Sequence, residues 1–401
     1  RCMSSRLHDI IIAGGSVAGA SLAWALCKHG MRVLLLEPEL QFRDRVRGES
    51  IHPWGVAEAE RLNLLPALQA ARARDVRYWD TYVAGERLMR RDLAATTPGS
   101  HSGLTVHHPE LQEALLSAAA QAGCEVRRGA RVIEVQPGEA PYVLSSDPTG
   151  TEHAHARLVV LADGRSSALR AQLGLITRGD RSGVCVSGVL LESTCAEDAV
   201  GTFYPPVLGS MALLAPLRAD RTRVYLVQQT AATRERYSGP ARVDALLSHC
   251  RQLGVPEPFT SSARALGPLG TFDTTLSELD PASLPPGVVA VGDAAGPVDP
   301  ALGCGMSMAL RDARTLRDHL LTQPDLQRAA AQFARERAAY HGALLRIEGW
   351  LRRILYRCGT DSPGVLDAAM IRLDALRVDL IGLGPDARSD VQTEAQLFAD
   401  P

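Results

Sequence analysis

The stretch Asp9–Gly19, DIIIAGGSVAG, limits the possible folds more than any other part of the chain. A short apolar run ends at Ala13, two glycines follow, and Ser16–His29 is rich in small residues. Gly30 then separates this segment from a second apolar run, Met31–Glu37. This order predicts a strand, a helix and a second strand, because glycine ends helices and short apolar runs suit buried strands. We therefore expect a βαβ unit at the N-terminus.

The turn of this unit nearly matches the dinucleotide-binding pattern G-x-G-x-x-G, with Ser16 in place of the second glycine. Gly14 allows a tight turn, Gly19 allows the helix to pack closely, and free amides at the helix start accept a pyrophosphate. Serine is small enough for backbone to approach the phosphates, and its hydroxyl can cap the helix or bond a phosphate oxygen. Val17 and Ala18 complete the predicted phosphate turn.

Glu37 ends the second apolar run, at the distance from the turn where nucleotide-binding folds place an acidic residue. A carboxylate there bonds the 2′-hydroxyl of a ribose, which argues against a 2′-phosphate. A glycine turn alone can join any strand to any helix. In this βαβ context, Glu37 favours nucleotide binding over a purely structural turn.

A second segment, LVVLADGRSSALR, places polar groups at the end of another apolar run. Asp163 and Gly164 follow the run, and Ser167 and Arg170 open the next element. An ordinary Asp-Gly turn is the alternative interpretation.

The segment 288–313, VVAVGDAAGPVDPALGCGMSMALRDA, is the most specific of the three. An apolar run delivers Asp293, a proline-containing loop passes through Pro300, and Gly303 and Gly305 precede a predicted helix. Aspartate at a strand end can bond sugar-like hydroxyls, glycine lets backbone lie against a flat ring, and a helix start favours a developing anion. The combination favours a cofactor site over three unrelated turns.

The rest of the chain predicts further helices and strands. Helices are expected over Pro109–Ala122 and about Gly305–Leu321. The segments expected to form strands are Glu125–Arg128, Ala130–Gln136, Tyr142–Ser145, Leu158–Ala162, Val184–Leu190, Ser210–Ala215, Arg223–Gln229 and Val288–Val291. The tail from Asp325 has apolar residues at helical spacing with arginines between them. We interpret it as a helix packed on its own domain, with a membrane-surface or partner helix as the alternative.

The expected fold class is α/β, with a Rossmann-like nucleotide-binding domain, an inserted mostly antiparallel β-sheet domain and a helical C-terminal tail. The nucleotide-binding domain is expected to be discontinuous, over residues 4–70, 104–180 and 281–321. The substrate-binding sheet domain is expected over 71–103 and 181–280, and the helical region over 322–401.

Together the three segments resemble the FAD-dependent aromatic hydroxylases of the para-hydroxybenzoate hydroxylase type, the single-component flavoprotein monooxygenases. The resemblance follows the family's order and spacing over roughly the first 320 residues. It implies an FAD-binding domain, with the pyrophosphate at Gly14–Gly19, the adenosine ribose on Glu37 and the ribitol on Asp293. Asp163 and Gly164 would serve both FAD and nicotinamide binding.

The resemblance implies further FAD contacts. Arg47, in RVRGESIHPWG, matches an arginine that touches FAD in relatives, with a solvated charge as the alternative. His108 stands where relatives often have arginine, and Ser307 where many have asparagine. The other residues assigned to FAD by resemblance are Val132, Pro300, Gly303, Gly305 and Met306.

The resemblance also implies a mechanism. NADPH or NADH visits as a transient reductant, since no second glycine fingerprint is present, and the reduced flavin captures O2 as a C4a-hydroperoxide. The expected reaction is hydroxylation or epoxidation of a small aromatic or polycyclic substrate, in a setting such as bacterial secondary metabolism. Candidates for polarising the substrate are His52, Tyr78, Tyr82 and Tyr204, each of which has a core or surface role as its alternative.

Three other functions stay open. A geranylgeranyl-reductase-like enzyme would reduce an alkene in the same FAD frame, and GESIHP and GDAAGPVDP also suit it. A flavin-dependent halogenase is less favoured, because the WxWxIP segment and the usual active-site lysine are missing from the sequence. A flavin-binding protein without turnover is the remaining alternative.

Composition excludes several partners. A formal charge of −2 provides no basic field for nucleic acid, and no apolar window is long enough to cross a membrane. Eight scattered cysteines lack the paired spacing of a metal or CxxC site, so we expect no metal and a cytoplasmic location. The expected partners are a small-molecule substrate and O2.

Overall fold

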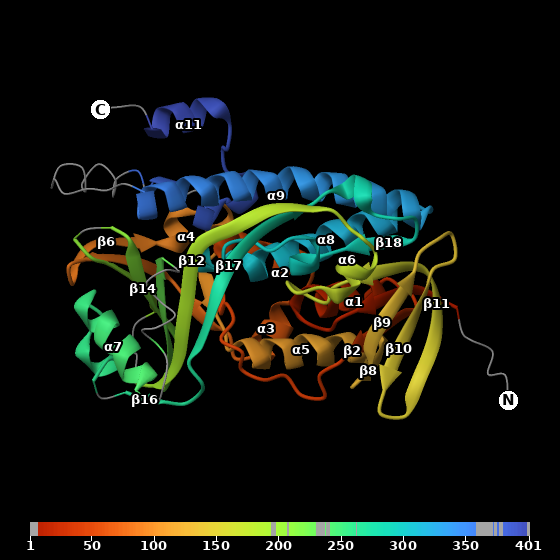
Figure 1. The fold of residues 1–401 in the computed structure, drawn as a ribbon, viewed down its shortest axis with the longest axis horizontal. Coiled ribbons are helices and arrows are strands. Elements are labelled where there is room, and N and C mark those ends of the chain that lie inside the picture. The colour runs from red at the N-terminus through yellow and green to blue at the C-terminus, as the bar shows by residue number, and fades with distance from the viewer. Residues whose placement is uncertain are drawn as a thin grey trace.

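A computed structural model describes the fold, and Figure 1 shows its arrangement. The described residues are 7–193, 198–206, 208–229, 237, 241–261, 263–357, 372, 375–376 and 380–398. Within them, no helix is long and apolar enough to cross a membrane.

The N-terminal sheet is built around the predicted βαβ unit. Its seven described strands include a parallel set in the order β8-β2-β1-β11, with β18 also pairing in parallel with β11. Strands β10 and β9 extend the sheet as antiparallel neighbours of β11. The strands are β1 (His8–Ala13), β2 (Val33–Glu37), β8 (Glu125–Arg128), β9 (Arg131–Gln136), β10 (Tyr142–Asp147), β11 (Gly150–Leu161) and β18 (Val288–Ala290).

Helices cover one face of this sheet. An apolar core joins the sheet to the helices α1 (Val17–Lys28), α5 (His108–Gln121), α8 (Gly305–Thr322) and the start of α9 (Leu326–Arg357). Ile10 and Ile12 of β1 are fully buried in it, as an apolar strand in a parallel sheet requires. The short helix α6 (Ala168–Gln172) lies after β11 and contributes Leu169 to the core on the other face.

The second sheet has eight described strands, in the order β16-β12-β15-β14-β13-β5-β6, with β17 also pairing with β12. Its neighbours are antiparallel except β13 and β5, which are parallel. The strands are β5 (Tyr78–Val83), β6 (Glu86–Asp92), β12 (Thr177–Glu192), β13 (Ala199–Tyr204), β14 (Ser210–Arg218), β15 (Arg221–Gln229), β16 (Arg264–Ala265) and β17 (Gly270–Leu279). The helix α7 (Arg242–Gln252) packs on one face through Leu246 and Cys250.

Short elements connect the two sheets. A three-stranded sheet pairs β3 (Ser50–Ile51), β7 (Gly103–Thr105) and β4 (Arg74–Val76). The helices around it are α2 (Pro53–Arg61), α3 (Leu65–Ala70) and α4 (Leu93–Thr96). The 3-10 turns are η1 (Pro98–Ser100), η3 (Glu257–Phe259), η4 (Pro281–Ser283), η5 (Gly292–Ala295), η6 (Pro300–Leu302) and η7 (Gly384–Asp386).

The long helix α9 runs along the molecule and spans both sheets (Figure 1). Phe333 joins the core of the nucleotide-binding sheet, whereas Leu344, Ile347 and Leu351 join the core of the second sheet. The apolar face of this helix is thus covered by its own chain, which confirms the packed-helix interpretation. The last described helix, α11 (Val391–Phe398), lies outside α9 in the figure.

The structure confirms the α/β fold class and the predicted elements within the described residues, and two strands begin well before their predicted starts. Part of the predicted helical region 322–401, including residues 358–371, lies outside the described residues. β11 begins at Gly150 and not at Leu158, and β12 begins at Thr177 and not at Val184. The start of β11 forms a hairpin with β10 and exposes Thr151, Glu152 and His153, so it lacks the apolar signature of its buried end. The proposed domain boundaries remain a proposal, although β5 and β6 of segment 71–103 do join the second sheet.

Candidate functional site

The first turn leaves no room for side chains at two of its glycines. Gly14 has φ +113°, and a Cβ there would lie 2.4 Å from the carbonyl oxygen of Ala162. A Cβ on Gly19 would lie 2.0 Å from the carbonyl oxygen of Gly14. Both contacts are shorter than real Cβ atoms tolerate, so these glycines hold β1, α1 and the end of β11 together. The turn therefore keeps the free amides of α1 at the carboxyl edge of the sheet.

Ser16 does not cap α1 through its side chain, which corrects one of the two roles considered for its hydroxyl. Its Oγ instead accepts a hydrogen bond from Nε2 of Gln112, at 3.0 Å. Gln112 lies in the first turns of α5, so the sequence predicted its helix but gave no sign that it meets a serine 96 positions away. The two side chains place an amide and a hydroxyl beside the predicted phosphate turn.

Glu37 lies at the carboxyl end of β2, against the same turn. Its Oε2 accepts from the Gly15 N–H at 2.7 Å, and its Oε1 accepts from the Glu39 N–H at 2.8 Å. Burial raises the pKa of the Glu37 carboxyl, while these two backbone hydrogen bonds and Arg128 oppose the rise. Each oxygen keeps a free lone-pair direction, as bonding to a ribose hydroxyl requires.

Arg170 connects the two later motifs. Ser167 accepts from the Arg170 N–H at 3.0 Å and caps α6, while the Arg170 guanidinium donates to the carbonyls of Asp293 and Ala294 at 3.2 and 2.9 Å. The Asp163 carboxylate is exposed and accepts weakly from the Leu169 N–H at 3.4 Å. Arg170 therefore holds the backbone that carries the Asp293 carboxylate.

The loop that carries Asp293 is also held from behind by α9. Arg337 is buried and donates to the carbonyls of Gly292, Ala295 and Gly296 at 3.1, 2.8 and 3.3 Å. Its Nε donates to Oδ2 of Asp312 at 2.7 Å, and that same oxygen accepts from the Gly292 N–H at 2.7 Å. This arginine was not predicted from sequence, because it lies in the tail and its partners are on another helix and a loop.

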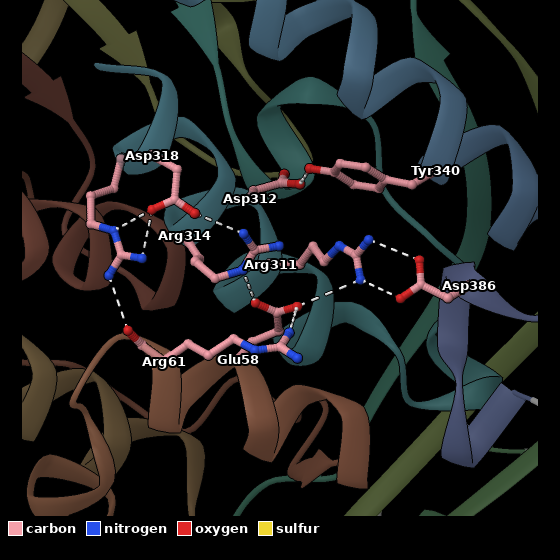
Figure 2. Close-up of polar contacts among 9 residues, drawn as sticks. Glu58, Arg61, Arg311, Asp312, Arg314, Asp318, Tyr340 and Asp386 are labelled. Atoms are coloured by element: carbon pink, nitrogen blue, oxygen red, sulfur yellow. Dashed lines mark hydrogen bonds and ion pairs between the residues drawn. The ribbon is translucent and has the colours of Figure 1, made fainter. Parts of the chain in front are cut away.

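A second ionic cluster holds α8 against α2 (Figure 2). Glu58 of α2 is almost fully buried and pairs with Arg311 and Arg314 of α8 and with Arg61 of its own helix. Arg311 also forms two hydrogen bonds with the Asp386 carboxylate, at 2.7 and 2.9 Å. The cluster therefore fixes α8 relative to both α2 and the C-terminal segment.

An open cavity lies between the Pro300–Gly303 loop and the second sheet. Most of its lining is apolar and comes from residues 48–52, strands of the second sheet, residues 300–303 and residues 380–381. The lining residues are Gly48, Glu49, Ser50, His52, Trp79, Val186, Leu213, Tyr225, Val227, Phe272, Pro300, Ala301, Leu302, Gly303, Leu380 and Ile381.

Among the proposed catalytic candidates, the structure places only His52 in the cavity lining. Its backbone N–H donates to Ser307 Oγ at 3.1 Å, and its Nε2 lies 2.9 Å from the Leu302 carbonyl oxygen, which requires a donor at that nitrogen. Ser307, noted as a departure from the family pattern, therefore fixes the start of α2 against α8.

The three tyrosine candidates lie elsewhere in the second sheet. Tyr78 is within cation–π distance of two arginines, Tyr82 stacks on Phe203 with ring centroids 4.5 Å apart, and Tyr204 is fully buried in an apolar core. None of them is among the described residues that line the cavity. A substrate role for these tyrosines remains an untested prediction.

Three FAD residues assigned by resemblance have distinct surroundings. His108 is buried, its Nδ1 lies 2.9 Å from the Gly48 carbonyl oxygen, and burial lowers its pKa to about 4. Arg47 is exposed at the surface. The surrounding protein nevertheless removes part of the water around its guanidinium and so lowers its pKa, while the Asp293 carboxylate acts in the opposite direction. Val132 lies half-buried in β9 and pairs with Ser145. His108 is thus a neutral group where relatives often have a cation.

A buried ion pair at the cavity escaped sequence analysis. Arg223 of β15 donates to both carboxylate oxygens of Glu49, at 2.8 and 3.0 Å, and to Asp44 at 2.8 Å. The Tyr225 hydroxyl lies 2.6 Å from the Arg47 carbonyl and 3.1 Å from Glu49. Because Glu49 and Tyr225 line the cavity, this network forms a polar part of the cavity wall. Its partners lie 174 or more residues apart in the sequence and leave no local pattern.

The glycines along the loops fit a flat ring at this cavity. A Cβ added to Gly48 would meet nothing within 4 Å, and one added to Gly305 would meet only Val298, at 3.9 Å. The Asp293 carboxylate is partly exposed at the end of β18, with the Arg165 Nε 3.9 Å away. Phosphate-binding amides, a sugar-binding carboxylate and open glycine backbone are the groups that an extended FAD needs. The residues present fit that cofactor.

Comparisons with known proteins agree with this fit. Residues 8–329 match the family described as FAD binding domain. AqdB1 of Rhodococcus erythropolis, which bears the name of a 2-heptyl-3-hydroxy-4(1H)-quinolone synthase, is 31% identical over 80% of this chain and 82% of its own length. Squalene monooxygenase of Mus musculus is 27% identical over 83% of this chain, which spans only 58% of the mouse protein.

A solved structure has the same fold. The crystal structure of PqsL from P. aeruginosa with 2-aminobenzoylacetate superposes with a TM-score of 0.73, at 22% identity, over 90% of this chain and all of the other. The match to the FAD binding domain covers most of the chain, and it includes every segment that carries the predicted cofactor contacts. The chain therefore belongs to the FAD binding domain family of flavoproteins, as the resemblance to the para-hydroxybenzoate hydroxylase type predicts.

Proposed function

We propose that this protein is an FAD-dependent monooxygenase that takes electrons from NADPH or NADH and uses O2 to oxygenate a small, largely apolar aromatic or polycyclic substrate. The observation that carries the proposal is the cavity, which has the cofactor loop Pro300–Gly303 on one side and the apolar strands of the second sheet on the other. FAD, when bound, would supply hydride acceptance from the nicotinamide and activation of O2.

The chain's own residues would bind and orient the cofactor. The amides around Gly14–Gly19 would bind the pyrophosphate, the Glu37 carboxylate the adenosine ribose and the Asp293 carboxylate the ribitol. The N-terminus of α8, an 18-residue helix, carries positive potential that would stabilise negative charge on a flavin bound beside it. Two ion pairs, Glu58–Arg314 and Asp312–Arg337, hold this helix and the Asp293 loop in position.

The cavity lining would exclude water from the reacting atoms. The apolar surface of the cavity comes from Trp79, Val186, Val227 and Phe272. Such a surface would keep water, and the protons it supplies, away from the reacting atoms. The Glu49 carboxylate and the Tyr225 hydroxyl are the polar groups that a substrate hydroxyl or ring N–H could meet. This composition supports a flat apolar substrate with few polar groups.

The reductant, the location and the assembly are further parts of the proposal. The sequence has one glycine fingerprint, which suits FAD and leaves the nicotinamide as a transient visitor. We place the protein in the cytoplasm, with a small-molecule substrate and O2 as partners.

The test begins with the absorbance spectrum of the purified holoprotein, followed by a screen for compounds that accelerate NADPH or NADH oxidation. Incorporation of 18O from labelled O2 into the product would support oxygenation. A saturated product formed without O2 would instead establish an alkene reductase, and a halogenated product formed only with halide would establish a halogenase. Flavin binding with no compound that stimulates nicotinamide oxidation would favour a protein without turnover.

A further inference from the structure

A buried glutamate contacts the backbone of a buried aspartate directly behind the cavity wall. Asp299 immediately precedes Pro300–Gly303, the part of the cofactor loop that lines the cavity, and Glu348 lies on α9. Both residues have 0% of their surface exposed. The pair therefore joins the C-terminal helix to the wall of the proposed active site.

The hydrogen bonds of this pair are incomplete. The Asp299 N–H donates to Oε2 of Glu348 at 3.0 Å, and Oδ1 of Asp299 accepts from the Ala301 N–H at 2.9 Å. Among the described residues, neither Oδ2 of Asp299 nor Oε1 of Glu348 has a hydrogen-bond partner. Two ionised carboxylates with unpaired buried oxygens would be strongly destabilising, whereas a single proton on the pair removes one charge.

Two arginines face the pair. The Arg352 Nε lies 3.7 Å from Oδ2 of Asp299, and Arg165 acts on Asp299 from the loop after β11. The Cys304 thiol, at the start of α8, donates to the Leu302 carbonyl at 3.7 Å and also acts on Glu348. Burial raises the pKa of Asp299, Glu348 and Cys304, and the negative charge of Asp299 raises that of Glu348 further. Arg352 thus acts on both carboxyls, whereas Arg165 acts on Asp299, so Glu348 is the less compensated member of the pair.

We propose that Glu348 is a positioning residue that keeps its proton at neutral pH, and that the protonated Glu348–Asp299 pair holds the Pro300–Gly303 wall against α9. The inference rests on the proposed function only in taking this cavity as the place where flavin and substrate bind. It assigns the C-terminal helix a role at the site beyond packing.

The expected pH dependence follows from the raised pKa of Glu348. A carboxyl whose pKa is higher in the folded than in the unfolded state stabilises the fold at low pH, and this contribution is lost as pH rises through the folded-state pKa. Deprotonation then places two carboxylates side by side and separates the loop from α9. We expect an alkaline transition in which the wall opens while the rest of the fold persists.

The experiment measures hydrogen exchange of residues 299–304 together with flavin fluorescence of the holoprotein, from about pH 7 to about pH 10. Above the transition, loop opening should increase by about tenfold per pH unit after correction for intrinsic exchange rates. Glu348→Gln keeps the shape and the acceptor oxygen without an ionisable group, so it should retain FAD and lose the transition. The matched control is Glu336→Gln on the same helix, where the side chain is 49% exposed and the transition should be unchanged.

Asp299→Asn provides a second route to the same answer if Glu348→Gln fails to fold. It removes the other charge of the pair, so it should also abolish the transition. A wild-type protein without the transition, or a Glu348→Gln protein that keeps it at the same midpoint, would overturn the inference. The proposed function fails separately, if the wild-type holoprotein shows the transition but no compound stimulates nicotinamide oxidation.

Discussion

The Nε of Arg337 lies 2.7 Å from Oδ2 of Asp312, and the same carboxylate oxygen accepts the backbone N–H of Gly292. Arg337 comes from α9, Asp312 from α8 and Gly292 from the loop that carries Asp293. Tyr340 donates to the other oxygen of Asp312 at 2.5 Å. One buried carboxylate therefore ties two helices to the loop that is expected to hold the ribitol of FAD.

Replacing Arg337 by methionine should release this loop. The change leaves the Asp312 charge buried without its cation and leaves three backbone carbonyls without donors, a combination that costs about 3–5 kcal/mol. We expect a lower free energy of unfolding and loss of FAD, measured by urea denaturation and by flavin absorbance after gel filtration. Arg335→Met, at an exposed position of the same helix, should change neither, and a similar loss in both variants would contradict the explanation.

The phosphate turn should tolerate change at Ser16 but not at Gly19. Ser16→Gly loses only the hydrogen bond to Gln112, so FAD should be retained, whereas a bulky residue there should expel it. Gly19→Ala should abolish FAD binding, because its Cβ would lie 2.0 Å from the Gly14 carbonyl oxygen. Gly349→Ala in α9 is the matched control for added bulk, since nothing lies within 4 Å of the new Cβ and the position is outside the cavity lining. FAD content per chain measures all three.

The sequence predicted the elements that local patterns define. The β1–α1–β2 unit, the Asp163 turn and the Asp293 loop were readable because glycine punctuation and apolar runs act over a few residues. Relationships between distant segments were not readable. Arg223 and Glu49 lie 174 residues apart, and an isolated arginine in a strand looks like a surface charge until the sheet places it against the cavity. The same holds for Arg337 and Glu348, whose helix was predicted without its partners.

Acid should destabilise the protein through His108. Burial lowers the pKa of this histidine to about 4, below its ordinary value of 6.5, so the folded state resists protonation. As pH falls below 6.5, the unfolded state gains a proton that the folded state does not, and stability declines by about 1.4 kcal/mol per pH unit until about pH 4. His108→Gln should reduce the difference in unfolding free energy between about pH 7 and about pH 5 by about 2 kcal/mol. An unchanged difference would show that another group dominates.

Glu58 should be important for the position of α8. It is 1% exposed and pairs with Arg61, Arg311 and Arg314. Glu58→Gln removes the buried counter-charge that Arg311 and Arg314 share and leaves them only the more exposed Asp386 and Asp318. We expect a loss of about 3 kcal/mol in the free energy of unfolding, measured by urea denaturation. Asp318→Asn is the control, because Asp318 pairs with Arg314 but is 44% exposed, and it should cost at most about 1 kcal/mol. Equal losses would contradict the burial argument.

The cavity should bind aromatic compounds, and filling it should separate substrate binding from FAD binding. Leu213 of β14 lines the cavity from the second sheet, away from the predicted phosphate and ribose contacts. Leu213→Trp should weaken the binding of 2-naphthol, followed by a change in flavin fluorescence, by at least about tenfold, or about 1.4 kcal/mol. The FAD content should not change.

Leu88→Trp is the matched control for this prediction, because Leu88 lies in β6 of the same sheet and is 57% exposed. It adds the same side chain to the same sheet without entering the cavity, so 2-naphthol binding should equal that of the wild type. If Leu213→Trp left binding unchanged, the aromatic compound would have to bind outside this cavity. If it removed FAD as well, the cofactor would have to extend beyond the glycines at positions 48, 303 and 305, where we propose that it lies, and reach Leu213.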